Sequence, residues 1–172
     1  MLAELQFLAR ASYYDTYLSY IKQTDILAEL DRSFAEFEGL ISPLTSDQLV
    51  YRYEKGKWSI AQVVQHLIET EMIFNYRAIT LCREEELTPM KGFDHDRYAQ
   101  MAKHGSFVAA DWVEFFRAVR TSTKYLFHTF SDEKLDRVGL ASGHRVQTRA
   151  LFYVNSGHTL HHCKVIRERY LG

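Results

Sequence analysis

The chain has 172 residues, the length of one domain. It can bury about 70% of its unfolded surface, so folding requires neither disulfides nor a metal. Twenty-one Lys and Arg against 22 Asp and Glu give a net charge of −1, which argues against nucleic-acid binding through a basic surface. The two cysteines, Cys82 and Cys163, lie far apart and exclude a disulfide scaffold or a Cys-x-x-Cys zinc knuckle.

No segment has the pattern of a membrane helix or of a secretion signal. The longest unbroken apolar run, Ala150 to Val154, is far shorter than the ~20 residues of a membrane helix. Glu4 stands where a signal peptide carries positive charge, and Arg10 interrupts the apolar stretch. We therefore expect a single cytoplasmic domain over residues 1–172, with no membrane partner.

Two helical segments are predicted at the start of the chain. Residues 1–22 form a docking segment whose short helix is rich in aromatic residues, namely Tyr13, Tyr14, Tyr17 and Tyr20. The next segment has apolar residues at alternating spacings of three and four, as in a bundle helix: Leu27, Leu30, Phe34, Phe37 and Ile41. Thr24 or Asp25 can cap this helix, and Ser42-Pro43 ends it.

Three more long helices follow. One begins at Ser59, which forms a capping box with Gln62, and its apolar seam continues to Leu81. Another begins near Asp111, and the last near Thr148. Four amphipathic helices of about 17 to 23 residues predict an all-α fold, a four-helix bundle.

The connections between these helices are informative as well. The segment from Cys82 to Ala110 is long for a compact domain, and we expect it to cross over the bundle and cover a pocket. Within it, a short helix is predicted from Asp94. Before the last helix, Val138 to Val146 alternates weakly around Ser142-Gly143, which predicts a small hairpin.

Histidines on two of the helices suggest a metal site. His158 and His162 lie four residues apart on the seam of the last helix and therefore point the same way. Two neutral imidazoles in this position can bind Zn²⁺ or Ni²⁺ at about 2.1 Å. His66, at the interior edge of the second long helix, is the candidate third ligand. The alternative is that all three are hydrogen-bonded core residues without a metal.

Charged residues near these histidines have two interpretations each. Glu71 occupies a seam position, where a carboxylate is costly unless it is paired or used. We favour an ion pair with Arg77 or Arg149, and the alternative is a catalytic role as general base beside the metal. Arg77 lies three turns after His66 and could meet an anionic ligand at the pocket mouth.

The substrate pocket is expected to include Arg77, Phe93 and Asp94. Asp94 is either a helix cap, which we favour, or a carboxylate of the pocket cover. His161 points away from the histidine pair and is assigned to packing, and His95 is assigned to the surface.

These residues give the chain a resemblance to the DinB-like superfamily of four-helix-bundle proteins, from Tyr13 to Leu171. The resemblance rests on residues 56–60 (GKWSI), 71–77 (EMIFNYR) and 92–96 (GFDHD), and above all on Gly157-His158-Thr159-Leu160-His161-His162 followed by Arg169-Tyr170. It implies a three-histidine site for a divalent metal at His66, His158 and His162. Met72 stands where similar members have arginine, which leaves the substrate class open.

The resemblance implies a metal-dependent hydrolase, or an S-transferase that uses a low-molecular-weight thiol such as bacillithiol or mycothiol. Either would use an open coordination position, and the partner would be a small-molecule substrate or thiol. The alternatives are a non-catalytic metal-binding or stress-response protein, and a helical dimerisation module with histidines as polar core. The aromatic content of 14% further predicts a homodimer, because aromatic side chains are enriched at interfaces.

Overall fold

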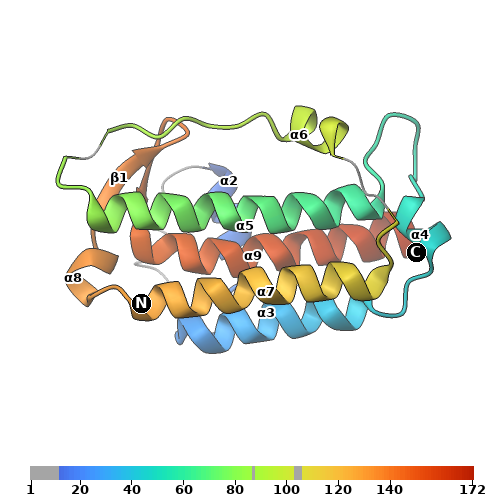
Figure 1. The fold of residues 1–172 in the computed structure, drawn as a ribbon, viewed down its shortest axis with the longest axis horizontal. Coiled ribbons are helices and arrows are strands. Elements are labelled where there is room, and N and C mark those ends of the chain that lie inside the picture. The colour runs from blue at the N-terminus through green and yellow to red at the C-terminus, as the bar shows by residue number, and fades with distance from the viewer. Residues whose placement is uncertain (1–11, 87, 103–105) are drawn as a thin grey trace.

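A computed structural model of the protein describes residues 12–86, 88–102 and 106–172 (Figure 1). Four long helices dominate it: α3 (Ile26–Ile41), α5 (Ile60–Arg83), α7 (Ala109–His128) and α9 (Thr148–Ile166). The shorter elements are α2 (Ser12–Leu18), α4 (Ser46–Val50), α6 (His95–Met101), α8 (Asp132–Leu135), β1 (Val138–Ala141), β2 (His144–Gln147) and the π-helical turn η1 (Arg167–Leu171). The predicted four-helix bundle with a small hairpin before the last helix is confirmed.

The helix starts follow the local sequence. The Asp25 side chain caps α3 by accepting from two backbone N–H groups. Ser59 and Gln62 form the predicted capping box at the start of α5, with side chain-to-backbone bonds of 3.0 and 3.3 Å. Helix α7 begins at Ala109, before the expected Asp111, because the Asp111 carboxylate accepts the N–H of Val108 from within the first turn.

The long helices form a square in which α5 and α3 lie on opposite corners. Helix α9 packs against α3 and α5, and α7 packs against the same two helices. Helices α5 and α7 run in the same direction, because the described residues of the connection between them return along the bundle (Figure 1). The predicted crossover of this long connection is confirmed, and it carries α6 over α5.

The hairpin fixes one end of this connection. Strands β1 and β2 pair antiparallel, and the turn residues Ser142 and Gly143 both have positive φ angles, of 53° and 80°. The N–H of Met90 donates to the Leu140 carbonyl, and the N–H of Ser142 donates to the Met90 carbonyl, both at 2.9 Å. The crossover connection is thereby attached to the hairpin turn.

Helix α2 packs against α9, and the two approach closely at Gly157. A Cβ atom on Gly157 would lie 2.1 Å from the carbonyl oxygen of Tyr17, so only glycine fits there. Residues 1–11 of the expected docking segment lie outside the described residues.

A polar layer crosses the middle of the bundle between two apolar clusters. One cluster, at the hairpin end, includes Tyr14, Phe74 and Phe152. The other, at the α4 end, includes Phe37 and Phe116. The buried polar side chains between them come from all four long helices: Ser33, Glu71, Arg120, Thr123 and Thr159. The histidines of α5 and α9 lie beside this layer.

Candidate metal centre

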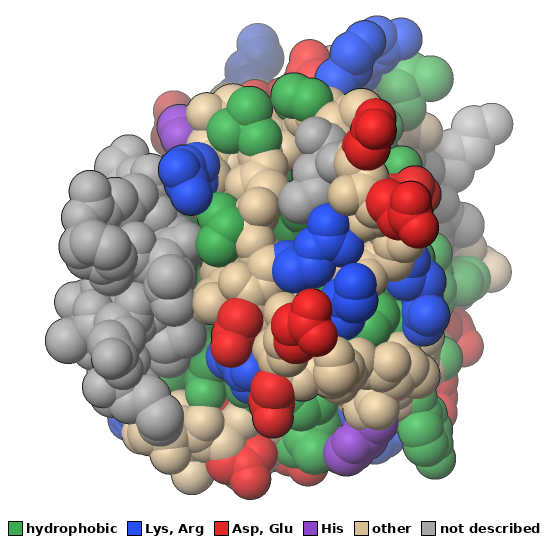
Figure 2. Space-filling view, turned by 90° about the vertical axis from the view of Figure 1, so that its left-hand side faces the viewer, with side chains coloured by type: hydrophobic (Ala, Val, Ile, Leu, Met, Phe, Trp, Pro, Cys, Tyr) green, Lys and Arg blue, Asp and Glu red, His purple; other side chains and the backbone are tan. Residues whose placement is uncertain are grey.

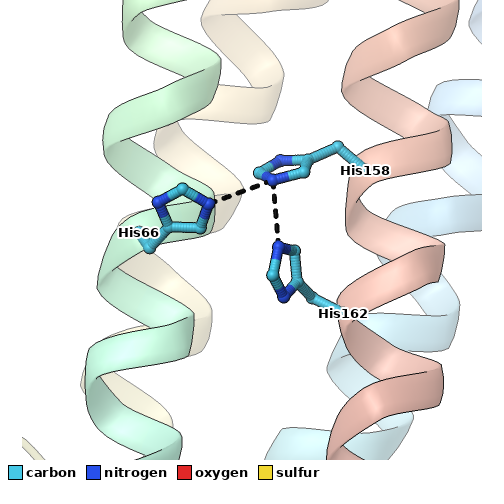
Figure 3. A group of neighbouring side chains, drawn as sticks. All are labelled: His66, His158 and His162. Carbon is cyan, nitrogen blue, oxygen red and sulfur yellow. Dashed lines mark hydrogen bonds between the residues drawn. The ribbon is translucent and has the colours of Figure 1, made fainter. Parts of the chain in front are cut away.

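Three imidazoles converge between α5 and α9 (Figure 3). The Nε2 atom of His158 lies 3.1 Å from Nε2 of His66 and 3.0 Å from Nε2 of His162. The three potential ligand atoms lie within 4.8 Å of one another. His158 is buried, and the other two are half-buried. The packing of α5 on α9 thus brings together the three residues expected as ligands.

A bound cation fits this arrangement better than hydrogen bonds do. A neutral imidazole nitrogen carries either one hydrogen or one lone pair, so His158 Nε2 cannot make two full hydrogen bonds. A cation at the centre would accept lone pairs from all three nitrogens at once. Ligands held tetrahedrally at 2.1 Å lie about 3.4 Å apart, close to the 3.1 and 3.0 Å that separate His158 Nε2 from the nitrogens of His66 and His162. The donor set therefore fits Zn²⁺ or a similar divalent ion.

Burial keeps these imidazoles neutral. It lowers the pKa of His66 to about 4, with a further contribution from the nearby His95. Burial and the mutual proximity of the rings lower the pKa values of His158 and His162 well below 6.5. Metal binding requires deprotonated histidine, so the site has its ligands in the required state at neutral pH.

The Nδ1 atoms of His66 and His162 have different surroundings. The Thr70 hydroxyl lies 3.4 Å from Nδ1 of His66 and helps to orient that ring. Nδ1 of His162 is buried without a hydrogen-bond partner in the described part of the chain. Its Nε2 is therefore the nitrogen through which this ring makes its polar contact.

The three histidines face a cavity of about 690 Å³. Its walls come from α2, α5, the crossover connection, the hairpin turn and α9, and four aromatic side chains line it: Tyr17, Trp58, Phe74 and Phe93. An ion on the histidines would thus have one side open to a largely aromatic pocket. A cavity of this size suits a small-molecule ligand.

Of the residues expected in the pocket, Arg77 and Phe93 line this cavity. Asp94 caps α6 by accepting the N–H of Arg97 at 3.0 Å, as the favoured interpretation predicts. Its side chain lines a neighbouring cavity instead of the one that contains the histidines. Met72, which stands where the resemblance places an arginine, is half exposed and is not among the residues that line the histidine cavity.

Glu71 forms an ion pair, but not with the expected partner. Its carboxylate accepts from Nη2 and Nε of Arg120 at 2.8 and 2.9 Å and from the Thr123 hydroxyl at 2.6 Å. The expectation of Arg77 or Arg149 was wrong because α5 and α7 run side by side and bring Arg120 opposite Glu71. Glu71 is buried and absent from the described cavity wall, which favours the ion pair over the catalytic role.

Arg149 is instead part of the charged end of the molecule. It pairs with Asp132 at 2.9 Å and with Asp136 at 3.0 Å. Figure 2 shows this end of the bundle, where Lys and Arg side chains alternate with Asp and Glu. The described residues of this face therefore form no large patch of a single charge. In the part of the chain that the structure describes, no helix is long and apolar enough to cross a membrane.

Sequence reasoning missed several residues of the cavity wall. His95, assigned to the surface, is exposed as expected, but it also lines the cavity, with its ring centroid 6.0 Å from that of His66. His161, assigned to packing, does pack edge-on against Tyr17 but also lines the cavity. Both positions depend on α2 and the crossover connection, which are distant in sequence from the histidine pair. The one available signal was the 92–96 segment, which places His95 two residues after Phe93.

Comparisons with known proteins identify the family. A family model described as the DinB superfamily matches residues 29–166, most of the chain. The chain belongs to the DinB superfamily. This DinB-superfamily chain also resembles the solved structure of YfiT from Bacillus subtilis, with a TM-score of 0.71 and 19% sequence identity over 87% of this chain and 90% of that chain.

YfiT is described as a probable metal-dependent hydrolase with an unusual four-helix bundle topology. At this identity, the likeness shows that the two chains share a fold. Among curated protein sequences, none matches this chain.

Proposed function

We propose that this protein is a metal-dependent hydrolase acting on a small molecule, with His66, His158 and His162 as ligands of Zn²⁺ or Ni²⁺. The observation that carries the proposal is the convergence of three neutral imidazole nitrogens on the wall of a cavity. The description of YfiT, which has the same fold, supports the same reaction class.

The donor set determines what such a centre can do. When bound, a divalent ion with three neutral ligands supplies Lewis acidity and makes a coordinated water or thiol acidic near neutral pH. The histidines would leave the cavity side of such an ion free for a substrate, and aromatic side chains line that cavity. His95, Asp96 and His161 line the same cavity and can carry protons to or from a substrate there.

Thiol transfer is the second candidate. The three ligands carry no negative charge, so the open position favours an anion such as hydroxide or thiolate. A low-molecular-weight thiol could bind there as thiolate. This thiolate, and not a water molecule, would then attack an electrophilic substrate. We propose, in either case, a protein that acts on small molecules and not on nucleic acid.

Activity of the untagged protein tests the proposal. Protein loaded with Zn²⁺ or Ni²⁺ is assayed with p-nitrophenyl esters and with anilides, and separately with 1-chloro-2,4-dinitrobenzene plus cysteine or bacillithiol. We expect turnover in one of the two assays, loss after chelation, recovery on metal addition and none in His162→Ala. Equal rates in the wild type and His162→Ala would exclude both reactions at this site.

A further inference from the structure

Two arginines are buried among the described residues, and they differ in their partners. Arg77 and Arg120 are each 2% exposed. Arg120 faces the carboxylate of Glu71 at 2.8 Å. Arg77 donates from Nη2 to the hydroxyl of Ser142 at 2.8 Å and to the carbonyl of Lys91 at 3.2 Å, both uncharged acceptors. No carboxylate in the described part of the chain pairs with Arg77.

An arginine in this position remains charged. The guanidinium group does not lose its proton in proteins, and a buried charge without a counter-ion is costly. Phe74 offsets part of this cost, since its ring centroid lies 5.4 Å from the guanidinium carbon. Neither the ring nor the two neutral acceptors cancels the charge, so Arg77 has no anionic partner among the described residues, although Asp96 lines the same cavity.

Arg77 belongs to the same cavity as the three histidines. Phe74 is close to both groups: its ring centroid lies 5.4 Å from the guanidinium carbon of Arg77 and 6.5 Å from the ring centroid of His158. A molecule of a few carbon atoms can therefore reach from the histidines to the guanidinium. The cavity has a metal-ligating end and a cationic end.

The hairpin turn holds the second group of this cationic end. Among the described residues, Ser142 is the only non-glycine residue with a positive φ, a conformation that costs energy and is usually left to glycine, asparagine or aspartate. The turn persists because the Ser142 N–H is bonded to Met90, and its hydroxyl receives the hydrogen bond from Arg77. Since that oxygen accepts from Arg77, its own hydrogen can be donated to a ligand.

We infer that Arg77 and Ser142 form an anion-binding subsite, which holds a carboxylate or phosphate group of the substrate while its reactive group lies at the histidines. The inference rests on the proposed function, which it deepens by giving the substrate class: a small molecule with an anionic group at one end. A guanidinium fork matches the oxygens of either anion, and the buried setting strengthens the contact.

Matched thiol probes test this subsite in the Zn²⁺-loaded protein. Isothermal titration compares 4-mercaptobutyrate and 3-mercaptopropylphosphonate with 4-mercaptobutanol, which shares the thiol but has no charge. We expect at least one acidic probe to bind at least about tenfold tighter than the alcohol, as charge-assisted hydrogen bonds provide. Whichever acid binds tighter identifies the anion that the subsite prefers.

Two variants assign the preference to Arg77. Arg77→Gln should remove the preference for the acidic probes without changing zinc content or affinity for the alcohol. Arg83→Gln, at an exposed arginine of the same helix, should retain it. Equal binding of all three probes by the wild type, or an unchanged preference in Arg77→Gln, would overturn the subsite.

A metal-free comparison separates this inference from the proposed function. Butyrate and butanol are added to the metal-free protein while the amide signals of Ser142 and Gly143 are followed by NMR. Shifts caused by butyrate alone support the subsite even if no metal binds, which would remove only the hydrolase proposal. Metal binding without any anion preference, in contrast, leaves the hydrolase proposal standing and overturns the subsite.

Discussion

Glu71 shows how strongly a single buried charge depends on its partner. Its carboxylate and the Arg120 guanidinium are nearly inaccessible to water, and Arg120 also donates to the Thr159 hydroxyl. Removing one member of such a pair leaves an uncompensated buried charge, which costs about 3–5 kcal/mol. We therefore expect Glu71→Gln to lower the free energy of unfolding by this amount, measured by urea denaturation.

The control for this prediction is Glu38→Gln, which breaks the half-exposed pair of Glu38 with Arg117. It should change stability far less, because water solvates both groups when they separate. A stable Glu71→Gln protein that lost only activity would instead support a catalytic role for Glu71.

The histidines make the stability of the metal-free protein depend on pH. The folded protein holds His66 with a pKa of about 4, whereas an unfolded chain has a histidine pKa near 6.5. Between pH 4 and pH 6.5, the unfolded state therefore binds more protons than the folded state. The free energy of unfolding that the protein has above pH 6.5 is reduced as the pH falls toward 4.

Urea denaturation at a series of pH values, with chelator present, measures this effect. The decrease between pH 6.5 and 4 should be smaller in His66→Gln, which removes one of the groups responsible. An identical pH profile in the two proteins would contradict the assignment of the effect to His66.

At the scale of elements, the packing of α2 against α9 depends on one glycine of α9. The ring of Tyr17 packs edge-on against His158 and His161, with centroids 4.9 and 5.5 Å away, and Gly157 allows this approach. Gly157→Ala should destabilise the protein by about 1–3 kcal/mol, because the new methyl group overlaps the Tyr17 backbone.

Gly39→Ala provides a control of the opposite sign. Gly39 lies within α3 and has nothing within 4 Å of an added Cβ, so alanine should stabilise the protein by about 0.5–1 kcal/mol. Denaturant unfolding of both variants gives the comparison, and a stabilised Gly157→Ala protein would show that α2 does not pack as described.

The helices themselves were predictable because their signals are local. Alternating three- and four-residue spacings, the Ser59 capping box and the Ser142-Gly143 turn each lie within a few residues of the element that they specify. The His158 and His162 pair was predictable for the same reason. Partners across helices were not: the length of the 82–110 connection predicts a crossover, but not which residue of α7 this brings opposite Glu71, and the partner is Arg120.

At the scale of the whole molecule, the residues of the cavity wall were the hardest to predict from the sequence. His95, His161 and Tyr17 reach it only because the crossover connection and α2 are brought against α5 and α9. Periodicity places a residue on one face of its own helix but does not specify which distant segment covers that face. The metal ligands could thus be predicted, while most of the wall around them could not.

We predict that the protein is a homodimer. Apolar side chains form an exposed stripe on the outer face of α5, where Met72, Tyr76 and Ile79 are 50%, 62% and 38% exposed. A second copy would bury this stripe, and exposed apolar patches of this kind are typical of interfaces. Sedimentation equilibrium at micromolar concentrations should give a dimer for the wild type and a monomer for Tyr76→Glu. A wild-type monomer would contradict the prediction.

Metal binding by protein purified without a histidine tag tests the central claim most directly. Titration of the chelator-treated protein with Zn²⁺ and with Ni²⁺ should show one ion per chain. His162→Ala should bind at least about tenfold more weakly, with unchanged helical circular dichroism, because the core is large enough to fold without the ion. If the wild type binds either ion no better than His162→Ala, the three histidines are not a metal site.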